Sequence, residues 1–134
     1  MTTSTTTLEL DSDPKKVADL QSRLSELCKA DGLDDAITGH ITTVVVEAIN
    51  NIIEHGYRNE LGRSIRVHWR SDNDSIHIEI RDLGQAIHAG IQDAVMPSPF
   101  DEHGRGRYII LKWSDSARHD RHGDENVLNL MWRR

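Results

Sequence analysis

Residues 44–57, V-V-V-E-A-I-N-N-I-I-E-H-G-Y, decide the fold of this chain. With a step of about 100° per residue, the apolar residues in and before this stretch fall on one side of a helix. They are Ile37, Ile41, Val44, Val45, Ala48 and Ile52. Glu47, Asn51 and His55 are spaced i, i+4 and i+8, so they form a polar row beside that side. Polar groups at a buried edge need a partner or a ligand, so the row predicts that the helix borders a binding site.

The rest of the chain alternates between helical and strand patterns. Gly56 is expected to end the long helix, as glycine does at the C′ position. Two alternating runs joined by the turn D-N-D predict a β-hairpin. The expected strands are 6–10, 65–70, 76–81, 118–120 and 127–132, and the expected helices are 14–30, 34–55, a weak fragment at 88–95, and 104–113. The order β-α-α-β-β-α-β-β predicts an α+β fold: a two-layer sandwich whose mixed, mainly antiparallel sheet is covered on one face by helices.

Length and composition limit the class of protein. The 134 residues suit a single domain, 1–134, and the formal net charge of −6 argues against direct binding to nucleic acid. No apolar run approaches the roughly 18–20 residues that span a bilayer, and the start, M-T-T-S-T-T-T, lacks the regions of a signal peptide. The single cysteine, Cys28, falls on an apolar helix face and is interpreted as a buried free thiol. These features predict a cytoplasmic protein that does not bind membranes.

Three short segments occur together in a specific order, although each is common alone. E-A-I-N-N-I-I-E-H-G-Y at 47–57 lies on the long helix, D-L-G-Q-A at 82–86 follows a strand, and H-G-R-G-R at 103–107 opens a helix. Together they resemble the N, G1 and G2 boxes of the GHKL ATPase superfamily. Within it they are most similar to the small anti-sigma-factor serine kinases of bacterial partner-switching systems. The resemblance covers nearly the whole chain and implies the Bergerat, or histidine-kinase-like ATPase, fold.

The resemblance also implies a site for ATP and Mg²⁺, with a role for each matching residue. Glu47 falls on the family's catalytic general base, which accepts the proton of the attacking hydroxyl. Asn51 falls on the Mg²⁺ ligand, with Asn50 and His55 as neighbouring nucleotide-binding positions. Asp82 falls on the residue that reads adenine, because its carboxylate accepts a hydrogen bond from the adenine amino group.

The remaining matches surround the purine and the phosphates. Gly84 would let the purine lie against the backbone, and Ala86 stands where the family often has a glycine. Gly104 and Gly106 would offer backbone N–H groups to phosphates at a helix N-terminus. The side chains expected to add positive charge there are Arg105 and Arg107. Residues 86–103 correspond to the ATP lid, which is short in this family.

Two further positions depart from the family pattern. Some of these kinases carry an arginine where this chain has Glu102, and position 107 is usually apolar but is arginine here. A carboxylate near the terminal phosphate is repulsive, so phosphoryl transfer and nucleotide binding without transfer stay separate hypotheses.

Three hypotheses about function follow from the resemblance. The first is a kinase that sequesters a sigma factor or other regulator and phosphorylates a serine on its antagonist, a STAS-type protein. The second is a nucleotide-binding module that sequesters regulators without efficient kinase turnover. The third, a detached histidine-kinase catalytic domain, is less favoured because the chain has no helical hairpin carrying a phosphoacceptor histidine. Family members are often dimers, and the sequence leaves homodimer formation open.

Overall fold

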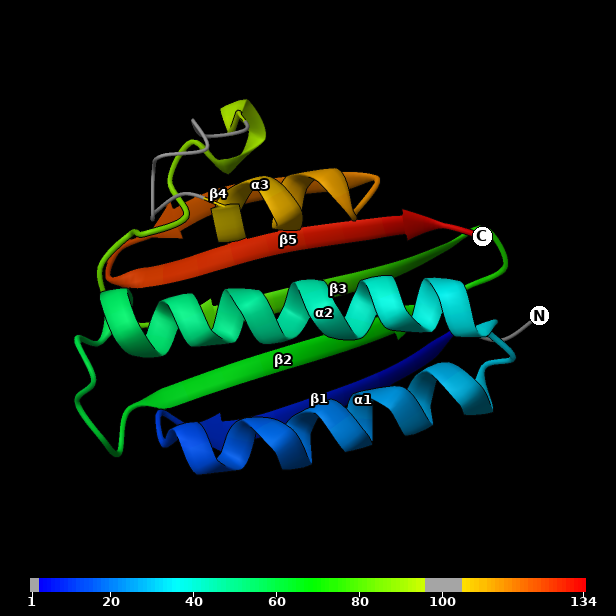
Figure 1. The fold of residues 1–134 in the computed structure, drawn as a ribbon, viewed down its shortest axis with the longest axis horizontal. Helices are drawn as coiled ribbons and strands as arrows, with labels where there is room; N and C mark the ends of the chain where they lie inside the picture. The colour runs from blue at the N-terminus through cyan, green and yellow to red at the C-terminus, as the bar shows by residue number, and fades with distance from the viewer. Residues whose placement is uncertain (1–2, 96–104) are drawn as a thin grey trace.

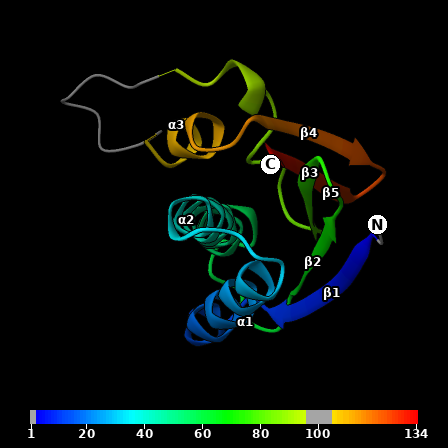
Figure 2. The ribbon, with the colours of Figure 1, turned by 90° about the vertical axis from the view of Figure 1, so that its right-hand side faces the viewer.

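The computed structural model describes residues 3–95 and 105–134, which form one layer of sheet and one layer of helices. The sheet order is β1-β2-β3-β5-β4, and every neighbouring pair is antiparallel. The helices all lie on one face of the sheet (Figure 1, Figure 2). The two-layer α+β fold expected from the sequence is therefore confirmed, with a sheet that is antiparallel throughout the described residues where a mixed, mainly antiparallel one was expected. The elements are β1 (Ser4–Asp11), α1 (Val17–Ala30), α2 (Asp35–Asn51), β2 (Ser64–Ser71), β3 (Ser75–Asp82), α3 (Arg105–Lys112), β4 (Ser116–His122) and β5 (Glu125–Arg133).

Aspartates fix the starts of the first two helices. The Asp13 carboxylate accepts a hydrogen bond from the Lys15 N–H in a short 3₁₀ turn, Pro14–Lys16, that leads into α1. The Asp34 carboxylate accepts one from the Ile37 N–H at 2.9 Å at the start of α2. Each carboxylate satisfies a backbone donor that the helix leaves unpaired, so these sequence positions determine where the helices begin.

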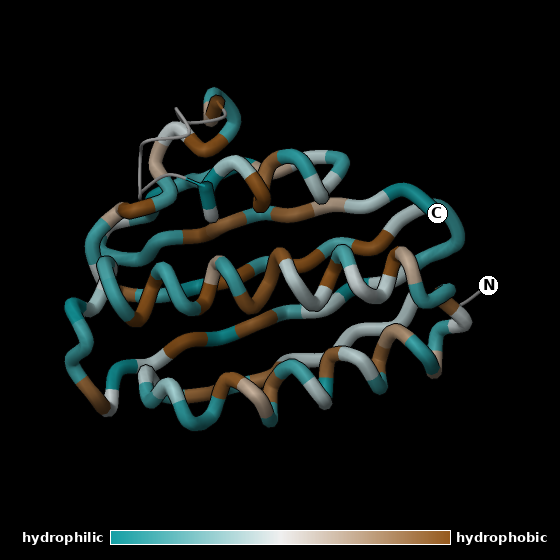
Figure 3. The backbone as a smooth tube through the Cα atoms, in the orientation of Figure 1, coloured by the Kyte–Doolittle hydropathy of each residue, from teal (hydrophilic) through white to brown (hydrophobic). Residues whose placement is uncertain are grey.

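The core lies between the sheet and the apolar side of α2. The residues expected to form that side are fully buried, except for Ile37, which is partly buried. Figure 3 shows apolar and polar residues alternating along the strands and recurring along α2. By length and composition the 22-residue stretch Asp35–Gly56 could cross a membrane, but half of its most apolar part is buried inside the fold. This stretch is therefore the core helix of the domain. The buried partners from the sheet are Ile65, Val67, Trp69, Ile76, Ile78, Ile80, Leu128 and Leu130.

Helix α1 completes the core beside α2 with its own apolar side. Leu20, Leu24 and Cys28 on that side are buried. Cys28 is therefore a buried free thiol, as expected, and burial raises its pKa to about 11. A thiol with so high a pKa stays protonated near neutral pH and has little nucleophilic character.

The end of the long helix differs from the expectation. The α-helix does not continue to His55, because Ile52–Gly56 forms a π-helical turn in which the Tyr57 N–H donates to the Ile52 carbonyl at 2.7 Å. Two consecutive isoleucines in this turn, Ile52 and Ile53, lie in the core, with exposed fractions of 0% and 1%.

Two smaller expectations about the backbone were wrong in detail. Gly56 ends the helical stretch, but not through the left-handed C′ conformation, which falls instead on Arg58 and Asn59 with φ of 52° and 63°. The weak helical fragment expected at 88–95 is reduced to a 3₁₀ turn, Ile91–Asp93. Gly90 precedes that turn in the left-handed conformation, with φ of 74°, which interrupts any longer helix.

Candidate functional site

The polar row of α2 divides where the α-helix gives way to the π-helical turn. Glu47 and Asn51 are half-buried, as is Asn50 beside them. The His55 side chain is 61% exposed, and its Nε2 lies 3.8 Å from a carboxylate oxygen of Glu54. A π-helical turn holds more residues than an α-helical turn, so His55 does not continue the line of the other two. The structure keeps Glu47 and Asn51 on adjacent turns of α2 and turns His55 toward solvent.

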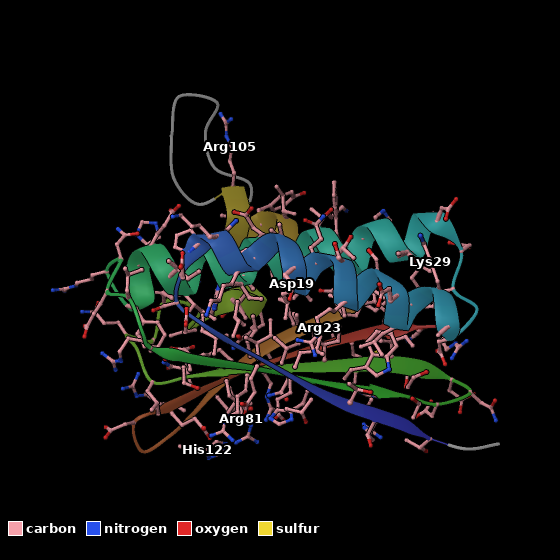
Figure 4. All side chains as sticks on the ribbon, turned by 90° about the horizontal axis from the view of Figure 1, so that it is seen from below. Asp19, Arg23, Lys29, Arg81, Arg105 and His122 are labelled. Carbon is pink, nitrogen blue, oxygen red and sulfur yellow. The ribbon has the colours of Figure 1, made fainter. Side chains whose placement is uncertain are left out.

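Helix α3 begins against the Glu47 carboxylate. A Cβ added to Gly106 would lie 2.2 Å from Glu47 Oε1 and 3.0 Å from its Cδ, far inside van der Waals contact. Glycine at position 106 therefore allows the first turn of α3 to approach Glu47, and a side chain there would displace the carboxylate. Figure 4 shows Arg105 projecting from the same turn away from the sheet. Residues 96–104, which include Gly104, Glu102 and much of the expected lid, lie outside the described residues.

Asp82 lies at the end of β3 and is only 5% exposed. Its Oδ1 accepts hydrogen bonds from the Gly84 N–H at 2.8 Å and from Asn126 Nδ2 at 3.1 Å. Burial raises the pKa of this carboxyl group, and the two hydrogen bonds, together with His119 and Arg121, oppose that shift. The carboxyl is therefore held in one orientation in a poorly solvated position, as recognition of a neutral polar group requires.

Asn126 is the residue of the site that sequence reasoning missed. Its Nδ2 bonds to Asp82 Oδ1 and to the Gly84 carbonyl at 2.9 Å, and its Oδ1 lies 3.0 Å from both His119 Nε2 and Arg121 Nη1. Asn126 pairs with Asp82 in the β3–β5 register. The sequence feature that could have indicated Asn126 is its position at the start of the last strand. In an antiparallel pair, the start of β5 lies beside the end of β3.

A glycine–glycine contact connects this strand end to the helix end. A Cβ on Gly84 would lie 2.6 Å from the Gly56 carbonyl oxygen and 2.7 Å from its carbon. The Gln85 N–H donates to that same oxygen at 3.0 Å. The Tyr57 hydroxyl reinforces the junction, because it accepts from the Leu83 N–H at 2.8 Å and donates to the Ser64 carbonyl at 2.6 Å. The need for glycine at 84 thus arises from close backbone packing, which was not foreseen.

Arg107 contacts backbone within the domain. Its Nη1 donates to the Ile87 carbonyl at 2.6 Å and its Nη2 donates to the Ala89 carbonyl at 3.0 Å. Ala86 lies at the start of the same segment, where its carbonyl accepts from the Ala89 N–H at 3.1 Å. The side chain expected to add charge at the phosphates is therefore engaged with the segment that follows Asp82.

Comparison with known proteins agrees with the fold described above. The family described as the histidine kinase-like ATPase domain matches residues 10–132. The chain belongs to this family. It is accordingly a nucleotide-binding domain.

Two relatives refine the comparison. An anti-sigma F factor from Oceanobacillus iheyensis is 35% identical over 98 residues, which cover 69% of this chain and 66% of that protein. A crystal structure of the RsbU and RsbW domains of a Mycobacterium tuberculosis protein is similar in fold, with a TM-score of 0.69 at 17% identity. That match covers 97% of this chain and 32% of the other, so the chain spans only part of the length of both relatives.

The Gly84→Ala substitution tests the glycine–glycine junction. We expect it to lower the free energy of unfolding by about 1–3 kcal/mol, because the added methyl group would overlap backbone atoms that cannot rotate away. Chemical denaturation measures the change. The matched control is Gly39→Ala: position 39 is helical with no atom within 4 Å of the added Cβ, so up to about 1 kcal/mol of stabilisation is expected. Equal effects of the two substitutions would contradict the proposed packing.

Proposed function

We propose that this chain is a Mg²⁺·ATP-dependent anti-sigma-factor serine kinase. It would sequester a sigma factor or other regulator and phosphorylate a serine on the STAS-type antagonist of that interaction. The observation that carries the proposal is the approach of Gly106, at the start of α3, to Glu47 Oε1, with Asn51 one turn further along α2. The family match, and the similarity to a protein named anti-sigma F factor, support the choice of partners.

The donor set suits ATP with Mg²⁺. The Asn51 side-chain oxygen is a hard ligand, and Mg²⁺ prefers such oxygens together with phosphate and water. The bound metal would supply neutralisation of the charge that develops on the phosphates. The Asp82 carboxylate would accept a hydrogen bond from the adenine amino group, while Asn126 and the Gly84 N–H hold its Oδ1. Backbone N–H groups at the start of α3, including that of Gly106, would face the phosphates.

Glu47 would act as the general base. The serine hydroxyl oxygen of the antagonist attacks the γ-phosphorus, the bond to the ADP oxygen breaks, and the hydroxyl proton passes to the Glu47 carboxylate. Gly106 supports this role because it leaves room for the carboxylate beside the turn where the phosphates would lie. Phosphoryl transfer depends mainly on positioning, so the fixed relation between α2 and α3 is a large part of the chemistry.

The alternative is a nucleotide-dependent binding module that sequesters regulators without efficient turnover. Glu102 is the reason to keep it, because a carboxylate near the terminal phosphate would oppose transfer. Both versions act on cytoplasmic regulatory proteins, and neither requires direct contact with nucleic acid or a membrane. Formation of a homodimer is compatible with either version.

Replacing Glu47 by glutamine tests the kinase hypothesis. We expect Glu47→Gln to lower the rate of phosphate transfer from γ-labelled ATP to a STAS antagonist by about 10²–10⁴-fold, because the amide cannot accept the proton. ATP binding should persist. Glu54→Gln is the matched control, since Glu54 lies on the adjacent π-helical turn with its side chain 60% exposed. Tight ATP binding by the unaltered protein with no label on its cognate antagonist would leave only the binding module.

The Asp82→Asn substitution tests the adenine position. Mg²⁺·ATP at 100 times its Kd should stabilise the unaltered protein by about 2.7 kcal/mol, read as a rise in Tm. Asp82→Asn should abolish most of that rise, because the Gly84 N–H and Asn126 Nδ2 would hold the amide oxygen and leave the N–H₂ group facing the adenine amino group. The exposed turn residue Asp74 offers the control Asp74→Asn, which should keep the full rise. An unchanged rise in Asp82→Asn would exclude Asp82 as the adenine contact.

The contact between Gly106 and Glu47 predicts that a substitution at position 106 lowers phosphate transfer without lowering the stability of the fold. We expect Gly106→Ala to reduce phosphate transfer at least tenfold by displacing the Glu47 carboxylate, about 1.4 kcal/mol or more in the barrier. The fold should not weaken, because alanine favours a helix over glycine. Steady-state transfer and thermal unfolding, compared with those of Gly39→Ala, measure the two effects. Full activity in Gly106→Ala would contradict the role given to this contact.

A further inference from the structure

We infer that Arg107 is a positioning residue, which straps the segment after Asp82 to the first turn of α3 and so holds the two halves of the nucleotide site in register. The inference rests on the proposed nucleotide site and deepens it. It assigns to Arg107 a structural strap in place of a contact with phosphate. Arginine is needed at this position because one planar guanidinium donates to two carbonyl groups at once.

The bonds of the strap are short and directional. Arg107 Nη1 lies 2.6 Å from the Ile87 carbonyl oxygen, and Nη2 lies 3.0 Å from that of Ala89. These carbonyls flank His88, whose side chain is 3% exposed. Burial lowers the pKa of His88 to about 3, so its imidazole is neutral and adds no charge beside the guanidinium at neutral pH. Two charge-assisted hydrogen bonds to main-chain acceptors therefore hold a segment that is buried at its centre.

The strap joins the two elements that carry the proposed ligand contacts. On one side, Arg107 follows Gly106, which lies against Glu47. On the other, Ile87 is reached from Asp82 through Gln85, whose N–H is fixed to the Gly56 carbonyl. The guanidinium thus links the segment after β3, whose end would hold adenine, to the start of α3, which would face the phosphates. A ligand that spans both parts binds more tightly when they are ordered in advance.

The two hydrogen bonds of the Arg107 guanidinium favour one of two possible roles for this side chain. A guanidinium that donates to two backbone carbonyls is directed into the domain. If Arg107 only supplied positive charge to phosphates, lysine would serve nearly as well. If it is a strap, lysine would fail, because its ammonium group cannot reproduce two parallel N–H donors in a fixed plane. The Lys variant therefore separates the two roles.

The experiment compares Arg107→Met, Arg107→Lys and the unaltered protein, with Arg118→Met as control. Arg118 is an exposed β4 arginine that pairs with Asp120 at 3.0 Å. Hydrogen–deuterium exchange is measured without nucleotide at the amides of residues 87–94, several of which donate within the segment. Calorimetric titration with Mg²⁺·ATP then gives Kd for each protein.

We expect both Arg107 variants to exchange faster over residues 87–94 and to bind Mg²⁺·ATP about tenfold more weakly or worse. The Arg118→Met control should match the unaltered protein in both measurements. Normal binding by Arg107→Lys, or weak binding by Arg107→Met with unchanged exchange, would overturn the strap in favour of a charge contact. Failure of the unaltered protein to bind Mg²⁺·ATP would overturn the proposed function and the nucleotide role of the strap, while exchange without nucleotide still decides whether the strap exists.

Discussion

The close approach of the Gly84 and Gly56 backbones is the constraint on which the site depends. Their contact brings the end of β3 against the end of the long helical stretch with no side chain between them. The Gln85 N–H and the Tyr57 hydroxyl then hydrogen-bond across the junction. Helix α2 and strand β3 also contribute side chains to one common core. The junction therefore holds the end of β3, which carries Asp82, beside the end of the helical stretch that carries Asn51.

The sequence was sufficient to predict elements that follow a local pattern, such as a regular apolar spacing or a capping residue. The apolar side of α2, the alternating hairpin strands and the aspartates that begin α1 and α2 all lie where their patterns indicate. These features depend on neighbours a few residues away, so local sequence contains the required information. The same reasoning placed Glu47 and Asn51 together, because one helix carries both residues.

Features that depend on contacts across the fold could not be predicted in this way. Asn126 is distant from Asp82 in sequence, and only the β3–β5 register pairs them. The π-helical turn at Ile52–Gly56 was likewise not predicted from the local spacing of the residues. Once that turn forms, His55 leaves the polar row, although its sequence spacing fits an α-helix. Arg107 is a basic residue in a glycine-rich segment, and its sequence context suggests a contact with phosphate. The fold shows instead that its Nη1 and Nη2 donate to two backbone carbonyls.

The charge of the proposed ligand explains why the two carboxylates need different surroundings. ATP is strongly anionic and the chain has a formal net charge of −6, so a carboxylate near the phosphates is unfavourable unless cations offset it. Asp82 avoids the conflict because it would face the neutral adenine, and its neighbours Asn126, His119 and Arg121 come from the two strands at that edge of the sheet. Glu47, in contrast, would lie close to the phosphates. In the proposed site its charge would be balanced by Mg²⁺ on Asn51 and by the positive end of the α3 dipole, which acts over about one turn. The missing side chain at Gly106 is what brings that helix end within this range of the Glu47 carboxylate.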